Sequence, residues 1–201
     1  QLAAAASRRG YDPGSTGVRR ILAEVARFGD SPGGRALAAA AREGRVLREV
    51  PFLLRLEPRE LDGAVPPAYL VGAIDALIEG RKGEGLTVVD YKYATYRPGA
   101  EVRYRLQLGA YALAAHRAHP GARVRARLQF LRGDCRTVDV TPWAEELERL
   151  AVEAPRLAWG VARGAGDRTP AELGRDEARC RAEGCGYVGR CYPRARRVDG
   201  V

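Results

Sequence analysis

Two apolar segments joined by a glycine-rich turn constrain the fold of this chain more than any other feature of its sequence. Residues 68–78 and 86–93 are rich in β-branched and aromatic side chains and have the length of strands. The intervening residues 80–85, Gly-Arg-Lys-Gly-Glu-Gly, favour a flexible turn. The pattern therefore predicts a β-hairpin.

The register of this hairpin predicts that two carboxylates face each other. If the turn is centred between Lys82 and Gly83, Asp75 lies opposite Asp90, and strand alternation places Lys92 on the same face as Asp90. Two carboxylates about 5 Å apart on facing strands repel each other. A hard divalent cation with oxygen ligands, with a lysine ammonium beside it, would stabilise such a pair.

That constellation suits hydrolysis of a phosphodiester bond. A metal ion polarises a phosphoryl oxygen and lowers the pKa of a bound water, while Lys92 can orient that water or stabilise developing negative charge. Lysine is a compact point charge, whereas arginine presents a fixed fork. Lys92 is thus the expected catalytic lysine in a chain whose positive charge is otherwise almost entirely arginine.

The remaining pattern alternates helices and strands. This order predicts an α/β fold, a mixed β-sheet flanked by helices, in which residues 1–44 form a helical segment, 45–163 the core and 164–201 a cysteine-containing tail. The expected helices are 18–29, 32–44, 101–119 (with Val102, Leu106, Tyr111 and Leu113 near one side) and one from 141 interrupted at Pro155; the further strands are 45–57, 123–131 and 136–140.

The composition indicates a globular chain with a polyanionic partner. The net charge of +9 favours nucleic acid, although arginines on solvated helix faces of an Arg-rich chain would give the same balance. No apolar run is long enough to cross a membrane, and Arg8-Arg9 comes too early for a signal peptide, so we expect a cytoplasmic protein. The absence of methionine suggests a piece of a longer protein.

Four short motifs in order resemble one nuclease family. They are Arg48-Glu49-Val50-Pro51-Phe52, Gly72-Ala73-Ile74-Asp75, Val89-Asp90-Tyr91-Lys92 and Gln107-Leu108-Gly109-Ala110-Tyr111. Together they resemble the RecB-like branch of the PD-(D/E)xK nuclease superfamily, and most of all the nuclease domain at the C-terminal end of UvrD/AddA-type helicase-nucleases. The resemblance implies a restriction-endonuclease-like core and a Mg²⁺- or Mn²⁺-dependent deoxyribonuclease that processes DNA ends in repair or recombination.

Site residues follow from the same resemblance. It implies Asp75, Asp90 and the backbone carbonyl of Tyr91 as metal ligands and Lys92 as the catalytic lysine. Gln107 and Tyr111, four residues apart on one helical face, would contact DNA or support the site, and Glu49 would support it from the preceding strand. Core or surface roles for Gln107, Tyr111 and Glu49 remain alternatives.

The chain departs from the family in lacking a histidine in the N-terminal helices, where many members of the branch carry a metal ligand. His116 and His119 are the only histidines, and their place near a helix end predicts surface residues. A catalytically degenerate nuclease fold that binds DNA or acts as a scaffold is therefore the alternative function. The implied partners are DNA, a helicase or ATPase region of the same polypeptide and a partner subunit, with no membrane.

Three cysteines cluster near the C-terminus. Cys180, Cys185 and Cys191 resemble the iron–sulfur cysteines of some RecB-like nucleases, whereas Cys135 is remote in the sequence and the N-terminal fourth ligand is missing. Free thiols are the favoured expectation; an iron–sulfur cluster, a zinc site or a disulfide are the alternatives.

Overall fold

The computed structural model describes residues 2–58, 65–81, 84–165, 176–182 and 192. The chain divides into two compact units, residues 1–155 and 156–201, which are described separately. The helices are α1 Leu2–Arg8, α2 Thr16–Asp30, α3 Pro32–Arg42, the 3-10 helix η2 Ala100–Tyr104, α4 Arg105–Ala118, α5 Ala144–Gly160, the π-helix η3 Val161–Ala165 and α6 Glu177–Ala182. Among these described residues, no helix has the length and apolar character to cross a membrane.

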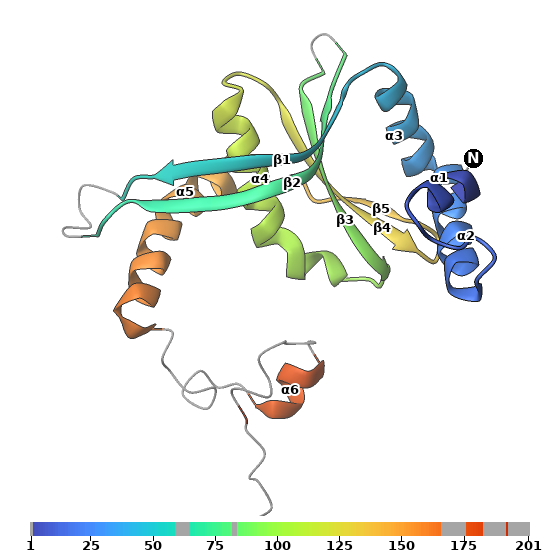
Figure 1. Cartoon of the computed structure of the whole chain (residues 1–201). Helices are drawn as coiled ribbons and strands as arrows, with labels where there is room; N and C mark the ends of the chain where they lie inside the picture. The colour runs from blue at the N-terminus through green and yellow to red at the C-terminus, as the bar shows by residue number, and fades with distance from the viewer. Residues whose placement is uncertain (1, 59–64, 82–83, 166–175, 183–191, 193–201) are drawn as a thin grey trace, which may run out of the picture. The chain divides into compact units, whose positions relative to one another are not determined.

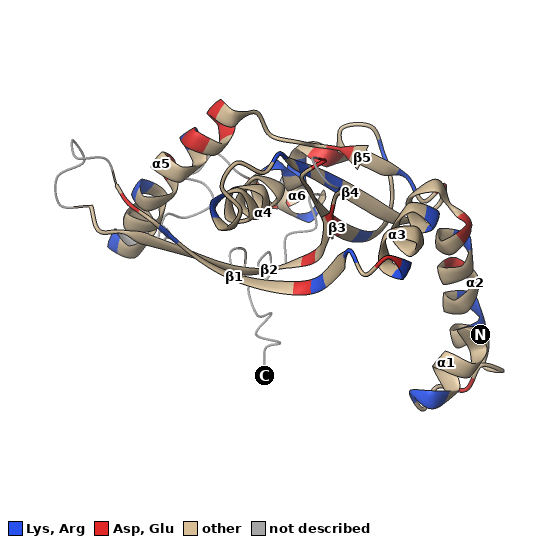
Figure 2. Cartoon of the chain, turned by 90° about the horizontal axis from the view of Figure 1, so that it is seen from above, with Lys and Arg blue, Asp and Glu red and all other residues tan. Residues whose placement is uncertain are grey.

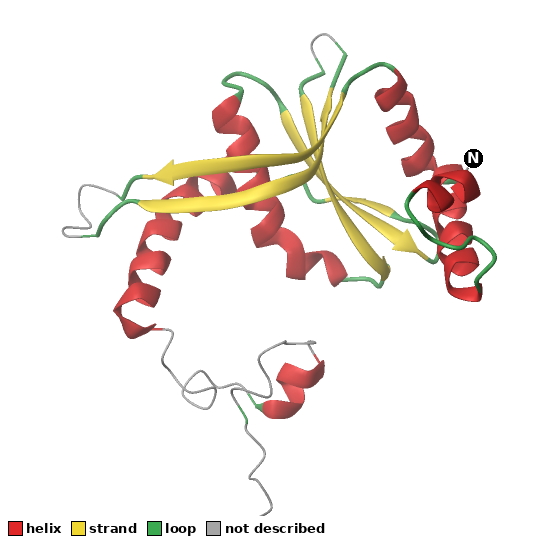
Figure 3. Ribbon diagram, in the orientation of Figure 1, coloured by secondary structure: helices red, strands yellow, loops and turns green. Residues whose placement is uncertain are grey.

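The first unit contains a mixed five-stranded sheet in the order β1-β2-β3-β4-β5 (Figures 1 and 3). Its strands are β1 Val46–Leu56, β2 Ala68–Glu79, β3 Leu86–Thr95, β4 Val124–Arg132 and β5 Thr137–Asp139. Strands β3 and β4 are parallel and the other neighbours antiparallel, with α4 in the connection between β3 and β4. The predicted α/β fold with a mixed sheet flanked by helices is confirmed.

Different helices cover the two faces of the sheet, and successive side chains along each strand point to one face and then the other. On one face, Val88 and Leu128 pack in one core cluster with Leu108 of α4. On the other face, Tyr91 meets the ring of Phe28 of α2 edge to face, with centroids 6.3 Å apart. Residues 88 and 91 differ in parity along β3, so the two faces follow directly from the strand period of two.

The start of α3 illustrates how local sequence sets an element. Ser31 is the N-cap, and its Oγ accepts a hydrogen bond from Gly34 N at 3.1 Å, while Pro32 occupies the first turn. Because proline lacks an N–H and has a fixed φ, it fits this position without losing a hydrogen bond. The helix expected over residues 32–44 therefore starts at Pro32, and it ends at Arg42.

The helix expected over residues 101–119 forms in two parts. Gly99 has a left-handed φ of 82°, and the chain then enters the 3-10 turn η2 before α4 starts at Arg105. Val102 and Leu106 are 66% and 67% exposed, whereas Leu113 is buried. Leu106 and Leu113 are seven residues apart in α4 and share one side as predicted, but Leu106 lies in the first turn and is exposed. Val102 departs from the prediction, because the tighter 3-10 turn rotates residues before 105 relative to α4.

Helix α5 continues through Pro155 to Gly160, so the predicted interruption does not occur. Proline in a helix interior removes one backbone hydrogen bond and crowds the preceding turn. Pro155 is fully buried. Burial of its ring contributes an apolar contact that offsets part of this cost.

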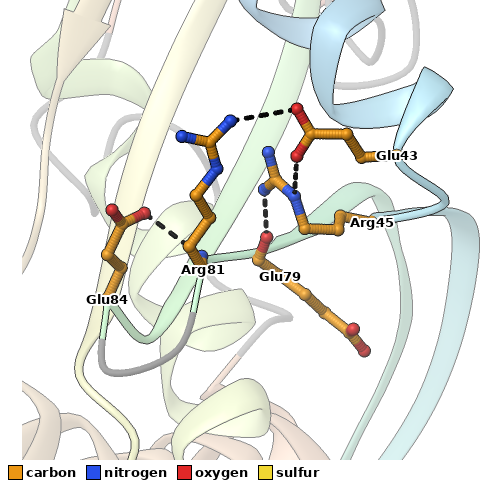
Figure 4. A network of polar contacts seen from close by, with 5 residues as sticks. All are labelled: Glu43, Arg45, Glu79, Arg81 and Glu84. Atoms are coloured by element: carbon orange, nitrogen blue, oxygen red, sulfur yellow. Dashed lines mark hydrogen bonds and ion pairs between the residues drawn. The ribbon is translucent and has the colours of Figure 1, made fainter.

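A polar network joins the end of α3 to the β2–β3 turn (Figure 4). Glu43 accepts from Arg45 Nε at 2.8 Å and from an Arg81 guanidinium nitrogen at 3.1 Å. Arg45 also donates to the Glu79 carbonyl at 2.5 Å, and the Glu84 carboxylate accepts from Arg81 N at 3.1 Å. These contacts connect the edge strand β1 to the hairpin that carries Asp75 and Asp90.

The network predicts a salt- and pH-sensitive contribution to stability. Hydrogen bonds from Arg45 and Arg81 hold the pKa of Glu43 below 4.5, so its contribution is present above pH 4.5 and is lost as the pH falls through the lowered pKa. Glu43→Gln should slightly lower the melting temperature at pH 7 in low salt. The loss should vanish at roughly 1 M NaCl, where the Debye length is about 3 Å.

Thermal unfolding followed by circular dichroism measures this effect. Glu153→Gln, an exposed glutamate with no ion pair to a described residue, is the matched control. Equal destabilisation by the two variants, or a loss that persists in high salt, would contradict the network.

Candidate active site

Strand β2 separates from β3 at Asp75. The ladder between them runs from Glu79–Leu86 to Ala76–Val89, as predicted, and then stops. Beyond this point β1 and β2 continue together away from β3, β4 and β5 (Figure 1). The two carboxylates of the predicted site therefore lie where the sheet opens, and not within a continuous ladder.

The Asp75 side chain occupies the end of this ladder. Gly80 N donates to Gly85 O at 2.7 Å, so every second facing pair from there is a hydrogen-bonded pair. By this alternation, a continued ladder would have Tyr91 N donate to the carbonyl of Ile74. Instead, Tyr91 N donates to Asp75 Oδ2 at 2.8 Å. A carboxylate thus replaces a backbone acceptor, which fixes Asp75 against β3 although the strands part.

Strand β1 is irregular at the same level. Its pairing with β2 includes Arg48–Ala76 and Val50–Ile74, but the intervening Glu49 does not pair with Asp75. Glu49 has a left-handed φ of 50°, which is uncommon outside glycine and costs about 1 kcal/mol or more. Glu49 therefore lies across from Asp75 in the register, with an exposed side chain.

Asp90 is a buried carboxylate beside a cation. Only 2% of its side chain is exposed, and Oδ2 lies 2.6 Å from Lys92 Nζ. Apart from this charged contact with Lys92, the buried Oδ2 has no hydrogen-bond partner among the described residues. Burial raises the pKa of Asp90, the Lys92 ammonium partly opposes this, and the neighbouring Asp75 carboxylate raises the pKa further.

Lys92 is held by three groups besides the strand that carries it. Its Nζ pairs with Asp90, donates to Gln107 Oε1 at 3.0 Å, and lies 4.4 Å from the centre of the Tyr104 ring. Gln107 Nε2 in turn donates to Tyr111 Oη at 2.9 Å. The structure thus brings Asp90, Lys92, Gln107 and Tyr111 into one connected chain, as their motif order predicts.

Tyr104 is a site neighbour that the sequence analysis missed. It lies three residues before Gln107, at the junction of η2 and α4, and a tyrosine at that spacing is the one signal that could have indicated it. The aromatic face attracts the ammonium through the ring quadrupole, which stabilises a partly desolvated lysine. Tyr104 therefore restricts where the Lys92 amine can lie.

The lack of a side chain at Gly72 leaves room for the Phe52 ring to pack against Tyr111. A Cβ at Gly72 would lie 2.9 Å from the ring of Phe52, its cross-strand partner in β1. Phe52 in turn meets Tyr111 edge to face, with centroids 5.7 Å apart. The Phe52 ring covers the space that a side chain at Gly72 would fill, and it fixes Tyr111 against the sheet.

Other predicted residues lie elsewhere or outside the described chain. His116 and His119 are exposed at the end of α4, in agreement with the expectation of surface residues. Cys135 and Cys180 are free thiols, both buried, and Cys180 is in α6 of the second unit. Cys185 and Cys191 lie outside the described residues.

The donor set at the open ladder fits a hard divalent cation. Within the part of the chain that the structure describes, no group of three or more His, Cys, Asp or Glu could hold a metal. Mg²⁺, however, is commonly held by one or two carboxylates together with waters and substrate phosphates. Asp75 and the unsatisfied buried Oδ2 of Asp90 supply such carboxylate oxygens.

Comparison with known families identifies the fold. The model of the PD-(D/E)XK nuclease superfamily matches residues 3–192. The chain belongs to the PD-(D/E)XK nuclease superfamily. Its members hydrolyse phosphodiester bonds and typically use divalent metals such as Mg²⁺. The narrower likeness to RecB-like helicase-nucleases remains a prediction.

Structural comparison adds matches to eleven chains of solved structures. The structure titled "Crystal structure of SSO0001" has a TM-score of 0.40 and 17% sequence identity, and the match covers 60% of this chain and 55% of that one. This chain therefore spans just over half of that structure. A search of curated proteins found no match.

The raised pKa of Asp90 predicts how the stability of this PD-(D/E)XK domain depends on pH without metal. The folded state holds the Asp90 proton more tightly than the unfolded state, whose pKa is 3.8. This stabilisation is therefore present below pH 3.8 and is lost as the pH rises through the raised pKa. Because Asp90→Asn cannot titrate, the wild type should lose free energy of unfolding relative to the variant over that pH range.

Urea denaturation in EDTA at several pH values from about 4 to 8 measures this difference. The difference in free energy of unfolding between the wild type and Asp90→Asn should become constant above the raised pKa of Asp90. A difference that is independent of pH would show that burial does not disfavour the charged Asp90.

Proposed function

We propose that this chain is a metal-dependent deoxyribonuclease domain that processes DNA ends as part of a larger helicase-nuclease. The observation that carries the proposal is the buried Asp90 carboxylate, placed between the Lys92 ammonium and Asp75 at the open end of a ladder. Oxygen ligands for a divalent metal ion with a positively charged amine beside them suit the hydrolysis of a phosphodiester bond.

Asp75, Asp90 and the Tyr91 carbonyl are the proposed metal ligands. The N–H and C=O of one residue in a strand point to the same edge, so the Tyr91 carbonyl faces the gap in which its N–H meets Asp75. A Mg²⁺ or Mn²⁺ ion bound there would polarise a phosphoryl oxygen and lower the pKa of a bound water.

Lys92 is the proposed catalytic lysine. Gln107 Oε1 accepts a hydrogen bond from the Lys92 ammonium, and the face of the Tyr104 ring restricts the ammonium on another side. The ammonium lies beside Asp90 on a side chain that is only 16% exposed. Lys92 can then donate to the attacking water or to a phosphate oxygen that gains negative charge in the transition state.

DNA as the substrate rests on charge and on motif order. The net charge of +9 favours a polyanion, and sequence-independent binding through arginine would weaken steeply with salt. The helicase context and a role in repair or recombination rest on the resemblance of the four motifs alone. A helicase or ATPase region would lie elsewhere in the polypeptide.

A second candidate is a degenerate nuclease fold that binds DNA without cleaving it. The observation that favours it is the lack, among the described residues, of a third acidic or histidine side chain at the site. Retention of Asp75, Asp90 and Lys92 in connected positions favours the enzyme instead.

Cleavage of end-labelled single- and double-stranded DNA tests the enzyme. The wild type should require Mg²⁺ or Mn²⁺, and Asp90→Asn should lose at least about 100-fold in rate, the upper end of losses seen for outer-shell metal partners. Asp134→Asn makes the same chemical change at an exposed position and should leave the rate unchanged. Equal inactivity of all three proteins, with DNA binding retained, would favour the degenerate fold.

Tyr104 should affect the rate through Lys92. A cation–π contact contributes about 0.5–2 kcal/mol, so Tyr104→Leu should lower kcat by roughly 2- to 30-fold. Tyr104→Phe keeps the aromatic face and should retain most of the activity. Single-turnover cleavage measures both variants, and an equal loss in the two would assign the effect to the hydroxyl instead of the ring.

A further inference from the structure

We infer that a basic surface around Trp143, separate from the candidate active site, binds single-stranded DNA by stacking a base on the indole. This Trp143 patch consists of Trp143 with Arg117, Arg123 and Arg125. The inference rests on the proposed function, in which DNA is the substrate, and it adds a second contact region to that site.

Two adjacent surface cavities lie within the Trp143 patch. A cavity of about 310 Å³ is lined by Arg123, Arg125 and Trp143, together with Asp139, Thr141 and Pro142. A second cavity of about 360 Å³ shares Arg123 and Pro142 with the first and adds Arg117. The two hollows therefore form adjacent surfaces between the end of α4, the start of β4 and the start of α5.

The arginines of the patch pair with no acidic side chain in the part of the chain that the structure describes. Arg105, Arg127 and Arg132 each pair with an acidic side chain. By contrast, Arg117, Arg123 and Arg125 make no ion pair or side-chain hydrogen bond with any described residue. Figure 2 marks lysines and arginines in blue, among them those of β4. Three guanidinium groups along the two adjoining hollows attract phosphate groups.

Trp143 presents its ring from a fixed backbone. The side chain is 74% exposed, although large aromatic residues usually bury their area. The backbone N–H of Trp143 donates to Glu146 Oε2 at 2.9 Å, as in a capping box, and Pro142 precedes Trp143 in the chain. Thr141 Oγ1 accepts from Ala126 N at 3.0 Å, which ties the same turn to β4. The exposed indole is thus carried by a turn whose backbone is fixed at both of these contacts.

A single strand is the partner that this combination fits. Bases stack on exposed aromatic rings in proteins that bind single strands, and a groove of positive charge follows the phosphates. Inside a duplex the faces of the bases are already stacked on one another, so only the terminal base pair would offer Trp143 a face, whereas a single strand offers one at every nucleotide. Asp139 and Glu148 also line the hollows, but Asp139 accepts from Thr141 N at 3.0 Å and lies 3.9 Å from Arg127.

The patch is distant enough from the site to be tested separately. Arg117 follows Gln107 by ten residues of α4, which corresponds to about 15 Å along the helix axis. Arg125 pairs with Thr87, five residues before Lys92 on β3, so it lies about 16 Å from Lys92 along the strand.

Trp143 fluorescence provides the direct test. Because the chain has two tryptophans, Trp159→Phe leaves Trp143 as the only one. Titration of this protein with a thymidine oligonucleotide in EDTA should quench the emission. Trp143→Ala, followed by fluorescence anisotropy of a labelled oligonucleotide, should weaken binding about 5- to 100-fold.

The arginines are tested by salt dependence. Each of Arg123→Ala and Arg125→Ala should reduce the slope of log K against log salt by about 0.7, the value for one phosphate contact on a single strand. Arg8→Ala and Arg9→Ala remove the same charge from exposed positions near α1 and should leave quenching unchanged.

Hydrolysis of bis(p-nitrophenyl) phosphate with Mn²⁺ separates the two proposals. Unchanged hydrolysis by Trp143→Ala, with weakened oligonucleotide binding, would support the patch. Absence of quenching, or equal quenching by the Arg8 and Arg123 variants, would overturn the patch even if the protein cleaves DNA. Quenching in a protein that hydrolyses neither substrate would keep the patch and overturn the nuclease.

Discussion

The burial of the Asp90 charge is the constraint around which the first unit is arranged. A carboxylate that is 2% exposed is stable as an anion only if positive charge lies beside it. Lys92 supplies this charge, and Gln107 and Tyr104 hold Lys92 in place from η2 and α4. Helix α4 therefore has two roles: its apolar side chains cover the sheet, and its first turn stabilises the charged pair.

Separation of β2 from β3 leaves Tyr91 without a backbone partner on β2 next to this charge. A continuous ladder would direct the backbone groups of Tyr91 to Ile74 and leave no space between the strands. The left-handed Glu49 in β1 and the Asp75 carboxylate at Tyr91 N coincide with the end of the ladder. The local backbone cost at Glu49 thus lies beside the proposed metal ligands, as is common where a fold forms a site.

Sequence periodicity predicted the hairpin and its register because apolar strand patterns and glycine turns are local signals. It also predicted the Asp90–Lys92 proximity, since residues two apart on a strand share a face. The end of the ladder at Asp75 could not be predicted, because the bond from Tyr91 N to the Asp75 carboxylate leaves no trace in the alternation of apolar residues. The contact between Tyr104 and Lys92 depends on the 3-10 turn after Gly99, which changes the helical phase in a way that a single helix pattern does not encode.

The different uses of lysine and arginine follow from the space available to each. The ammonium of Lys92 fits between Asp90, Gln107 and the Tyr104 ring because it is compact and can donate in several directions. A planar guanidinium at that position would need a wider opening and a second acceptor in its plane. On the surface, where phosphate groups can approach in two-point geometry, the planar fork is the better ligand. The buried lysine and the exposed arginines around Trp143 therefore suit two separate steps on one substrate, bond cleavage and strand binding.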